Sequence, residues 1–452
     1  MVGPSYQPPA PALPAQWQAV RPHAGDVAQL RQWWSRFDDA LLAQLIDTAQ
    51  RDSPSLEAAV MRIEQARANA RAVGAAGWPA LDLKSSLRRS AAGTPPLAAP
   101  MTNTSIAADA SWELDLFGGA RAAREVSRVR VTARESEWHD ARISLAAEVA
   151  NNYLGLRACE ALSANLQLDL DSRKQTVALT TQKVSAGFSA PADAALLRAG
   201  LADANSRLTA QLAECEVLVK SLVALTGAGE PALRELLVTR TARLPDAPAF
   251  AITEIPAIAL TQRPDLAAAE RELAAASYEI NVAEANRYPR LALTGSIGYA
   301  GMRLAGVTSD GTSWGFGPAL SLPIFDAGRR VAQADVARAR FGELRALYVQ
   351  RAREAVREVE QALVRLDASL RRQADVEAAI TDFEAFLAAA QTRWNAGIGN
   401  LIELEEARRQ ALNANAALVQ LRREQIAQWI TLYKALGGGW EQPATAGIEE
   451  RK

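Results

Sequence analysis

Four segments of the chain alternate between apolar and polar side chains with a period of two. In the first segment, Leu81, Leu83 and Leu87 share one side of an extended backbone, and charged side chains take the other side. Strands of about 10 residues with such faces are typical of a transmembrane barrel, and also of a half-buried sheet in a soluble protein. The alternation predicts β-strands at about 80–89, 104–116, 290–300 and 313–325.

Two very long helices are predicted after the strand pairs. No proline occurs from Met101 through Ala190 or from Ile324 through Gln442. A helix over residues 326–396 would be roughly 105 Å long, which no compact domain buries. Its apolar positions recur in steps of three and four, as in a coiled coil. Because these helices are committed to packing on one another, none is left to cover the sheet, which favours the barrel. Pro323 near a strand end is tolerable where the chain leaves such a barrel.

The chain contains one unit twice, with an offset of roughly 210 residues. Each unit has a helix that opens with proline, two strands, a very long helix, a short glycine-containing turn and a return helix. The landmarks that recur in the same order are Pro54 and Pro264, Pro79 and Pro289, Phe117 and Phe325, Gly187 and Gly397, and Gly227 and Gly437.

Four strands cannot close a barrel, and an open sheet edge is not tolerated in lipid. The chain is therefore expected to oligomerise, and the strand count alone leaves a dimer, a trimer and a tetramer open. The polar side chains expected to line the lumen carry both signs, which argues against a strongly ion-selective barrel. They are Asp82, Lys84, Arg88, Asp109, Glu113 and Asp115.

Charge and hydropathy exclude several classes of protein. The 452 residues carry 50 basic and 51 acidic side chains, a net charge of −1, with no basic stripe for nucleic acid. No apolar run reaches the roughly 18 residues that a transmembrane helix needs. Residues 1–22 are rich in proline and lack the apolar region of a signal peptide. We expect either a cytosolic protein or a mature chain whose export signal has been removed.

The chemistry-bearing residues do not assemble into a catalytic or metal-binding motif. Cys159 and Cys215 are interpreted as small buried apolar side chains, with a bridge between neighbouring helices as the alternative. His23 and His139 are too far apart in sequence to support a triad or a metal site. Residues 311–315 fit Gly-x-Ser-x-Gly but should enter a strand from a loop, unlike a nucleophile elbow. We expect no enzyme activity, no cofactor and no metal.

Three short elements carry a family resemblance together with the duplication. Residues 2–9 (Val-Gly-Pro-Ser-Tyr-Gln-Pro-Pro) are similar to the segment that follows a lipidated cysteine. Residues 33–37 (Trp-Trp-Ser-Arg-Phe) match an early Trp-Trp-x-x-Phe element. Residues 433–440 (Tyr-Lys-Ala-Leu-Gly-Gly-Gly-Trp) resemble a C-terminal signature. Over nearly its whole length the chain resembles the TolC-like outer-membrane efflux proteins, in particular the lipoprotein branch that serves resistance-nodulation-division (RND) pumps.

The resemblance implies a mainly α-helical fold with membrane β-strands. Three copies would form a 12-stranded outer-membrane β-barrel that continues as a periplasmic α-helical barrel. The implied partners are a periplasmic adaptor (membrane fusion) protein, an inner-membrane RND transporter and outer-membrane lipid. The turns between the long helices match the family's tunnel tips, where adaptors dock. The residues implied there are Gly187, Phe188, Gly397, Ile398, Gly399 and Asn400.

The chain departs from the family pattern at two places. Met1 stands near the place of the lipid-bearing cysteine, so a native N-terminal lipid anchor is expected although its cysteine is absent. Relatives often carry Asp just after the second tip turn, where this chain has glycine and asparagine. The nearest acids, Glu403, Glu405 and Glu406, are the candidates for a tip constriction, and solvated helix faces explain them equally well.

The expected function is that of an outer-membrane channel subunit, a passive exit duct for small toxic compounds or drugs in a tripartite efflux system. The alternatives are a duct for type I protein secretion and, less favoured, a soluble coiled-coil scaffold. The expected divisions are a proline-rich N-terminal segment (1–37) near the lipid anchor site, a first repeat (38–228, tip at about 186–190), a linker (229–256), a second repeat (257–440, tip at about 396–400) and a flexible tail (441–452).

Overall fold

The computed structural model describes residues 2–9, 13–20, 27–91, 100–246, 248–249 and 260–441. Apart from Glu441, the expected C-terminal tail lies outside these residues, as do parts of the N-terminal segment and of the linker. The chain forms two compact units, and each contains pieces of both sequence repeats. Unit 1 comprises Met1–Pro11, Ala59–Glu137 and Ala267–Gln350, and unit 2 comprises Ala12–Ala58, Trp138–Leu266 and Arg351–Lys452.

The helices begin where the sequence supplies a suitable first residue. Pro54 and Pro264 are the first residues of α2 and α7, where a helix needs no N–H donor. The α-helices are α1 (Ala40–Asp52), α2 (Pro54–Ala75), α3 (Gly119–Ser185), α4 (Pro191–Thr226), α5 (Glu230–Val238), α7 (Pro264–Ala285), α8 (Arg329–Asn395) and α9 (Leu401–Ala435). Two 3-10 helices, η1 (Val27–Arg36) and η2 (Gly437–Gly439), complete the helical elements of the described chain.

The long helices have the expected length. Both α3 and α8 contain 67 residues, and each is therefore about 100 Å long at about 1.5 Å per residue. Across the ranges that the structure describes, no helix combines the length and the apolar character needed to cross a membrane.

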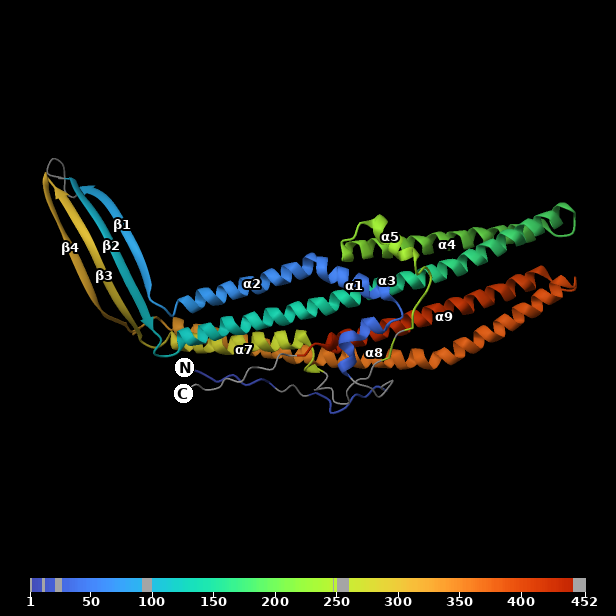
Figure 1. The fold of residues 1–452 in the computed structure, drawn as a ribbon. Helices are drawn as coiled ribbons and strands as arrows, with labels where there is room; N and C mark the ends of the chain where they lie inside the picture. The colour runs from blue at the N-terminus through green and yellow to red at the C-terminus, as the bar shows by residue number, and fades with distance from the viewer. Residues whose placement is uncertain are drawn as a thin grey trace. The chain divides into compact units, whose positions relative to one another are not determined.

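Unit 1 contains one antiparallel sheet in which the strands lie side by side in chain order (Figure 1). The inner pair, β2 with β3, joins a strand of the first repeat to a strand of the second. The edges β1 and β4 have no partner strand within the described chain. The strands are β1 (Ala80–Ala91), β2 (Pro100–Leu114), β3 (Arg290–Leu304) and β4 (Val307–Ser321).

The predicted strand bounds are wrong at several ends, each for a local reason. The loop expected between β3 and β4 is only Ala305 and Gly306, whose positive φ angles of 50° and 87° fit a two-residue hairpin turn. The pairing therefore continues to Leu304 and Val307. β4 ends at Ser321 and not at 325, because Pro323 has no N–H to donate to a ladder.

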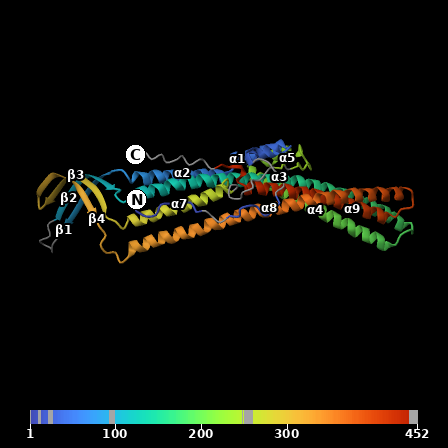
Figure 2. The ribbon, with the colours of Figure 1, turned by 90° about the horizontal axis from the view of Figure 1, so that it is seen from below.

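Unit 2 contains two helical hairpins, one from each repeat. We call them hairpin 1, the α3–α4 pair around residues 186–190, and hairpin 2, the α8–α9 pair around residues 396–400. Both views show α4 folding back along α3, and α9 along α8 (Figures 1 and 2). Small clusters of buried side chains join the paired helices, such as Leu170 with Ala204 in hairpin 1 and Ala390 with Leu404 in hairpin 2.

A disulfide joins the two helices of hairpin 1. Cys159 of α3 and Cys215 of α4 are bonded, with their Cα atoms 5.6 Å apart. The interpretation of these cysteines as two small apolar side chains is therefore wrong. Both cysteines face the contact between antiparallel helices at the same height, and this proximity allows the bridge that was the alternative interpretation.

An aromatic cluster in unit 2 joins residues 33–37 to Tyr433 near the end of α9. The ring centroids of Trp33 and Tyr433 are 5.2 Å apart in a stacked arrangement, and Trp34 meets Tyr433 edge to face at 4.7 Å. Phe37 lies 5.0 Å from Trp33. The early Trp-Trp-x-x-Phe element thus packs on the C-terminal signature, so two motifs noted separately in the sequence form one buried core.

Candidate functional site

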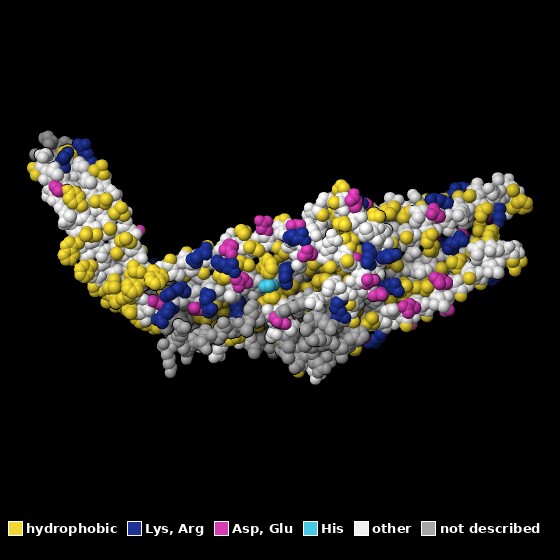
Figure 3. All heavy atoms as spheres, viewed as in Figure 1, with side chains coloured by type: hydrophobic (Ala, Val, Ile, Leu, Met, Phe, Trp, Pro, Cys, Tyr) yellow, Lys and Arg dark blue, Asp and Glu magenta, His cyan; other side chains and the backbone are white. Residues whose placement is uncertain are grey.

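The strand register divides the sheet into an apolar face and a polar face. Residues paired across an antiparallel ladder lie on the same face, so the pairings Leu83 with Ala108, Ala108 with Ile297 and Ile297 with Trp314 define one row across all four strands. The apolar face consists of Leu81, Leu83, Leu87, Ile106, Ala108, Ala110, Trp112, Leu114, Leu291, Leu293, Ile297, Tyr299, Trp314, Phe316 and Leu320. Most of these side chains are exposed, and apolar side chains cover much of the visible sheet in Figure 3.

Five of the six predicted lumen residues lie together on the polar face. Asp82 pairs with Asp109 across β1 and β2, and the Lys84 Nζ lies 3.0 Å from the Asp109 carboxylate. Much of the rest of this face carries small or hydroxyl-bearing residues, such as Ser86 and Ser105, whose hydroxyls are 2.8 Å apart. Arg290 adds a further cation to it, 4.0 Å from the Glu113 carboxylate. The five are Asp82, Lys84, Arg88, Asp109 and Glu113.

Asp115, the sixth predicted lumen residue, is misplaced by the sequence interpretation. β2 ends at Leu114, and the Asp115 carboxylate accepts hydrogen bonds from the backbone N–H groups of Ala120 (3.1 Å) and Arg121 (2.9 Å) at the start of α3. Burial raises the pKa of the Asp115 carboxyl, but these bonds and the Arg121 side chain outweigh burial and hold the pKa below its usual value. Asp115 therefore caps a helix, where a negative charge is favourable.

The two hairpin tips are built in the same way. Gly187 and Gly397 have φ angles of +79° and +76°, a left-handed conformation that ends a helix and that glycine adopts readily. The following N–H reaches back to the last turn in both, from Phe188 to Lys183 O (2.8 Å) and from Ile398 to Arg393 O (3.1 Å). The Phe188 and Ile398 side chains are left 83% and 80% exposed at the tips.

The second tip leaves no room for a side chain at one position of its turn. A Cβ atom on Gly399 would lie 2.6 Å from the Trp394 backbone nitrogen, so no side chain fits at this position. The next residue, Asn400, accepts a hydrogen bond from the Ile402 N–H (3.0 Å) and caps α9. Asn400 thus has a structural role in the chain, besides its predicted place in a docking site.

The three candidate constriction acids each pair with an arginine of the same chain. Glu403 pairs with Arg393 and Glu406 with Arg409, both at partly exposed positions. Glu405 is different because it is only 8% exposed. These pairings neutralise the carboxylates within one chain, and the constriction stays a prediction.

Glu405 and two cations connect hairpin 1 with hairpin 2, which the sequence did not indicate. The Glu405 carboxylate accepts hydrogen bonds from the Ser172 hydroxyl of α3 (2.9 Å) and from the Arg408 guanidinium (2.7 Å). Lys183 of α3 lies over the Trp394 ring of α8, 5.2 Å from its centroid. One signal was available: Glu405 occupies the apolar stripe of α9 between Leu401 and Ala411, where a charged side chain needs a buried partner.

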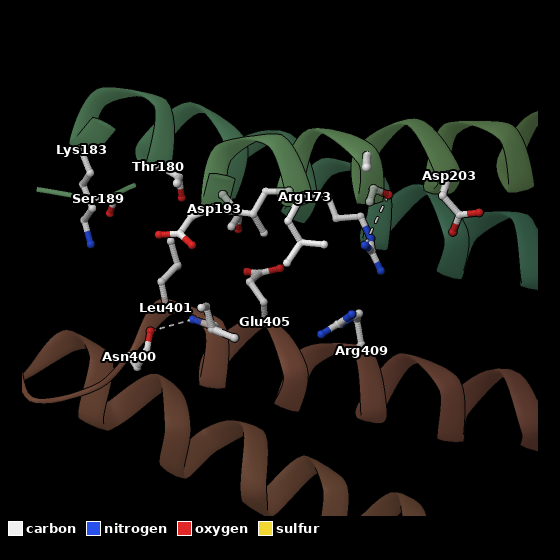
Figure 4. A pocket seen from close by; sticks show the side chains of 16 residues that line it. Arg173, Thr180, Lys183, Ser189, Asp193, Asp203, Asn400, Leu401, Glu405 and Arg409 are labelled. Atoms are coloured by element: carbon white, nitrogen blue, oxygen red, sulfur yellow. Dashed lines mark hydrogen bonds between the residues drawn. The ribbon is translucent and has the colours of Figure 1, made fainter. Parts of the chain in front are cut away.

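A cavity of about 480 Å³ lies between the two hairpins. Figure 4 shows side chains from α3 and α4 on one side and from α9 on the other, pointing into it. Its lining mixes charges of both signs with apolar side chains, including Arg173, Asp193, Leu401, Glu405 and Arg409.

Two chemical motifs considered in the sequence can be compared with the structure. Ser313 of the Gly-x-Ser-x-Gly sequence lies within β4 and not at a turn before a helix, so it is not placed as a nucleophile. Within the described ranges, no three His, Cys, Asp or Glu side chains come together as metal ligands.

Comparison with known proteins gives one consistent result. The family "Outer membrane efflux protein" matches residues 45–228 and 255–438, one match close to each predicted repeat. Outer membrane protein OprJ of Pseudomonas aeruginosa is 29% identical over 98% of this chain and 93% of its own length. The pyoverdine export outer membrane protein OpmQ of the same species is 30% identical over 95% of this chain and 92% of its own length.

Solved structures agree with this match. The outer-membrane channel OprN superposes with a TM-score of 0.84 at 27% identity, covering 98% of this chain and 100% of that one. The duplicated helical and β-stranded architecture is therefore that of an outer-membrane channel. From the family match and the identity to OpmQ, the chain belongs to the outer membrane efflux protein family.

Proposed function

We propose that this outer-membrane efflux channel works as a homotrimer, whose sheets close into one 12-stranded barrel. The observation that carries the proposal is the four-stranded sheet with one continuous apolar face and no partner strand for β1 or β4 within the described chain. Unpaired edges are not tolerated in lipid, so β4 of one copy has to pair with β1 of the next. Of the possible ring sizes, three copies agree with the expectation from the family resemblance.

The polar face would then line the lumen, and the apolar face would contact lipid. The lumen side carries Asp82, Asp109 and Glu113 together with Lys84 and Arg88, so neither sign of charge dominates. Such a lining favours a passive exit duct for small toxic compounds or drugs of varied charge. A passive duct needs no catalytic residues, and the energy for transport would come from a partner protein.

The proposed partners are a periplasmic adaptor and an inner-membrane RND transporter. OprJ and OpmQ are outer-membrane proteins, and OpmQ is described as a pyoverdine export protein. The exposed Phe188 and Ile398 at the hairpin tips offer apolar contacts for an adaptor. Gly187, Gly397, Gly399 and Asn400 would set the shape of these tips.

An N-terminal lipid anchor fits the position of the first residues. The Val2 N–H donates to the Phe117 carbonyl (3.2 Å), between β2 and α3, where the sheet would leave the membrane. The Tyr6 hydroxyl donates to the Glu270 carboxylate (2.6 Å), which holds the segment against α7. A lipid attached just ahead of Val2 would therefore reach the inner surface of the outer membrane.

The first test is the mass of the purified protein in detergent, measured by light scattering. A protein mass three times that of the 48.4 kDa chain is expected, together with steady conductance in planar bilayers. A detergent-free monomer without conductance would contradict the proposal and favour a soluble scaffold. Copurification with a type I secretion adaptor, and not with an RND partner, would reassign the duct to protein secretion.

The second test separates the two faces of one strand. Ile297→Arg places a charge in the middle of the apolar face, and we expect barrel insertion to weaken by about 2–4 kcal/mol. Ser296→Arg on the polar face is the matched control and should insert normally. Equal insertion of both variants, measured as trimer recovered from outer membranes, would refute the assignment of the faces.

A further inference from the structure

Near the β3–β4 turn, the apolar side chains of this face give way to a row of basic and hydroxyl-bearing side chains. From the Leu114 row to the Leu87 row the face spans ten residue steps of β2, about 34 Å along the strand at about 3.4 Å per residue. With the roughly 40° tilt of barrel strands this is a height of about 26 Å, close to the roughly 25 Å apolar band of an outer-membrane barrel. Tyr299, paired with Ile106, stands one row before the Leu87 row, near the end of the band, where aromatic side chains mark a membrane interface.

Two arginines stand on the same face beyond this band. The register pairs Arg89 with Thr102, Thr102 with Arg303, and Arg303 with Thr308. Arg89 and Arg303 are therefore two strands apart in one row, about 10 Å between their backbones. Both side chains are exposed. In Figure 3, basic side chains are visible at this end of the sheet, beyond the apolar ones.

Neither arginine is neutralised by the described chain. The Arg303 Nε donates to the Thr308 hydroxyl (3.3 Å), a neutral partner. The nearest acid of the row below, Asp310, accepts instead from the Tyr299 hydroxyl. In the part of the chain that the structure describes, no carboxylate forms an ion pair with Arg89 or Arg303. Two cations at the edge of the apolar band are therefore available to bind anions from outside the protein.

We propose that Arg89 and Arg303 form a binding site for the phosphate groups of the phosphorylated glycolipid of the outer leaflet. This inference rests on the proposed insertion of the sheet. Guanidinium groups bind phosphate oxygens with two parallel hydrogen bonds, and Thr102 between them supplies a hydroxyl. The acyl chains would lie against the apolar face below, along Leu83, Ile297 and Trp314. A disaccharide with a phosphate at each end suits two cations about two strands apart.

The β3–β4 turn marks the outer end of the sheet. The opposite ends of β2 and β3 connect to α3 and α7, which places the arginine row at the end away from those connections. In the proposed channel this end faces the cell exterior. The anions at this end would therefore be the phosphates of the outer-leaflet glycolipid.

The experiment compares glycolipid binding by variants of the full-length protein in detergent. Purified lipid A with two phosphates is titrated, and bound copies are counted by native mass spectrometry, with the one-phosphate form as a second probe. We expect the double variant Arg89→Gln with Arg303→Gln to lose about tenfold or more in affinity for the two-phosphate form. The one-phosphate form should bind the unsubstituted protein more weakly, and salt should weaken both.

Arg88→Gln is the matched control, because Arg88 neighbours Arg89 but pairs with Asn103 on the polar face. Its lipid A binding should equal that of the unsubstituted protein. Unchanged binding by the Arg89 and Arg303 double variant, in a protein that still forms trimers and conducts, would overturn the lipid site and leave the channel intact. Loss of binding in Arg88→Gln alone would reverse the faces. Absence of trimers and conductance in the unsubstituted protein would instead refute the channel.

Discussion

Hairpin 1 and hairpin 2 occupy the same place in the two repeats, yet they are held together differently. In hairpin 1 the Cys159–Cys215 disulfide joins α3 to α4. The positions roughly 210 residues later are Ser369 and Gln425, and there the Gln425 amide donates to the Ser369 carbonyl (3.3 Å). A covalent bond in one repeat thus corresponds to non-covalent contacts in the other, where Gln425 also donates to Gln373 and the neighbouring Glu424 pairs with Arg372 (3.0 Å).

Because of this difference, the helices of hairpin 1 are fixed to each other, whereas those of hairpin 2 can shift. The disulfide prevents α3 and α4 from sliding along each other at that height. A neutral hydrogen bond contributes about 1 kcal/mol, and a small shift of α9 along α8 can exchange it for another. Hairpin 2, which lacks the covalent bond, is therefore expected to open locally more readily than hairpin 1.

The largest effect is expected from removing the disulfide. Cys159→Ser with Cys215→Ser should destabilise hairpin 1 by about 4 kcal/mol, because the bond closes a loop with a sequence separation of 56 residues. Amide hydrogen exchange within hairpin 1 should then accelerate by about a hundredfold or more. Hairpin 2 serves as the internal control, and equal acceleration in both hairpins would contradict the assignment.

The converse change makes the hairpins alike. Ser369→Cys with Gln425→Cys should form a bridge in hairpin 2 and stabilise it by about 2–4 kcal/mol against local opening. If hairpin 2 moves during opening, the oxidised variant should lose transitions between conductance levels in planar bilayers, and a reductant should restore them. A bridged variant that switches as before would remove the distinction between fixed and movable hairpins.

A smaller effect is expected where the two hairpins meet. Glu405→Gln leaves the Ser172 hydroxyl and the Arg408 guanidinium without their charged acceptor, and we expect a cost of about 1–3 kcal/mol. The measured quantity is hydrogen exchange in α9 together with the rate of conductance transitions. Glu406→Gln, whose pair with Arg409 is exposed, is the matched control and should change stability by less than about 1 kcal/mol.

The smallest effect is expected at the tip glycines, where the two hairpins should behave alike. Gly187→Ala and Gly397→Ala each force a side chain into positive φ, and no atom lies within 4 Å of the added Cβ in either case. Each should cost about 1 kcal/mol in local stability, by hydrogen exchange at the adjacent helix ends. A several-fold larger effect at one tip would mean that the tips are not equivalent.

The local patterns predicted much of the fold, because period-two alternation and long proline-free stretches depend only on neighbouring residues. The faces of all four strands follow from that alternation. The strand ends were missed where turn geometry decides, as at Ala305 and Gly306. The Cys159–Cys215 bond was only the alternative interpretation, because the sequence does not give the distance between two packed helices.

The candidate site was predictable to a similar degree. Membership of one sheet face required only the alternation, and the register puts Asp82, Lys84 and Glu113 on that face, while their place in a lumen stays a prediction. Asp115 was not, because a cap at the start of α3 competes with continuation of the strand. The link from Ser172 to Glu405 joins residues of different repeats, and no local pattern encodes such a contact.

The strand order has a consequence for how the channel can evolve. In the proposed ring, the two repeats meet at two kinds of strand pair. One is the β2–β3 pair within a chain, and the other is the β4–β1 pair between neighbouring copies. In a ring of identical single-repeat chains, every substitution would appear in every repeat of the ring. With two repeats fused in one chain, a substitution changes only every second repeat. One repeat can then specialise as a rigid support while the other stays mobile.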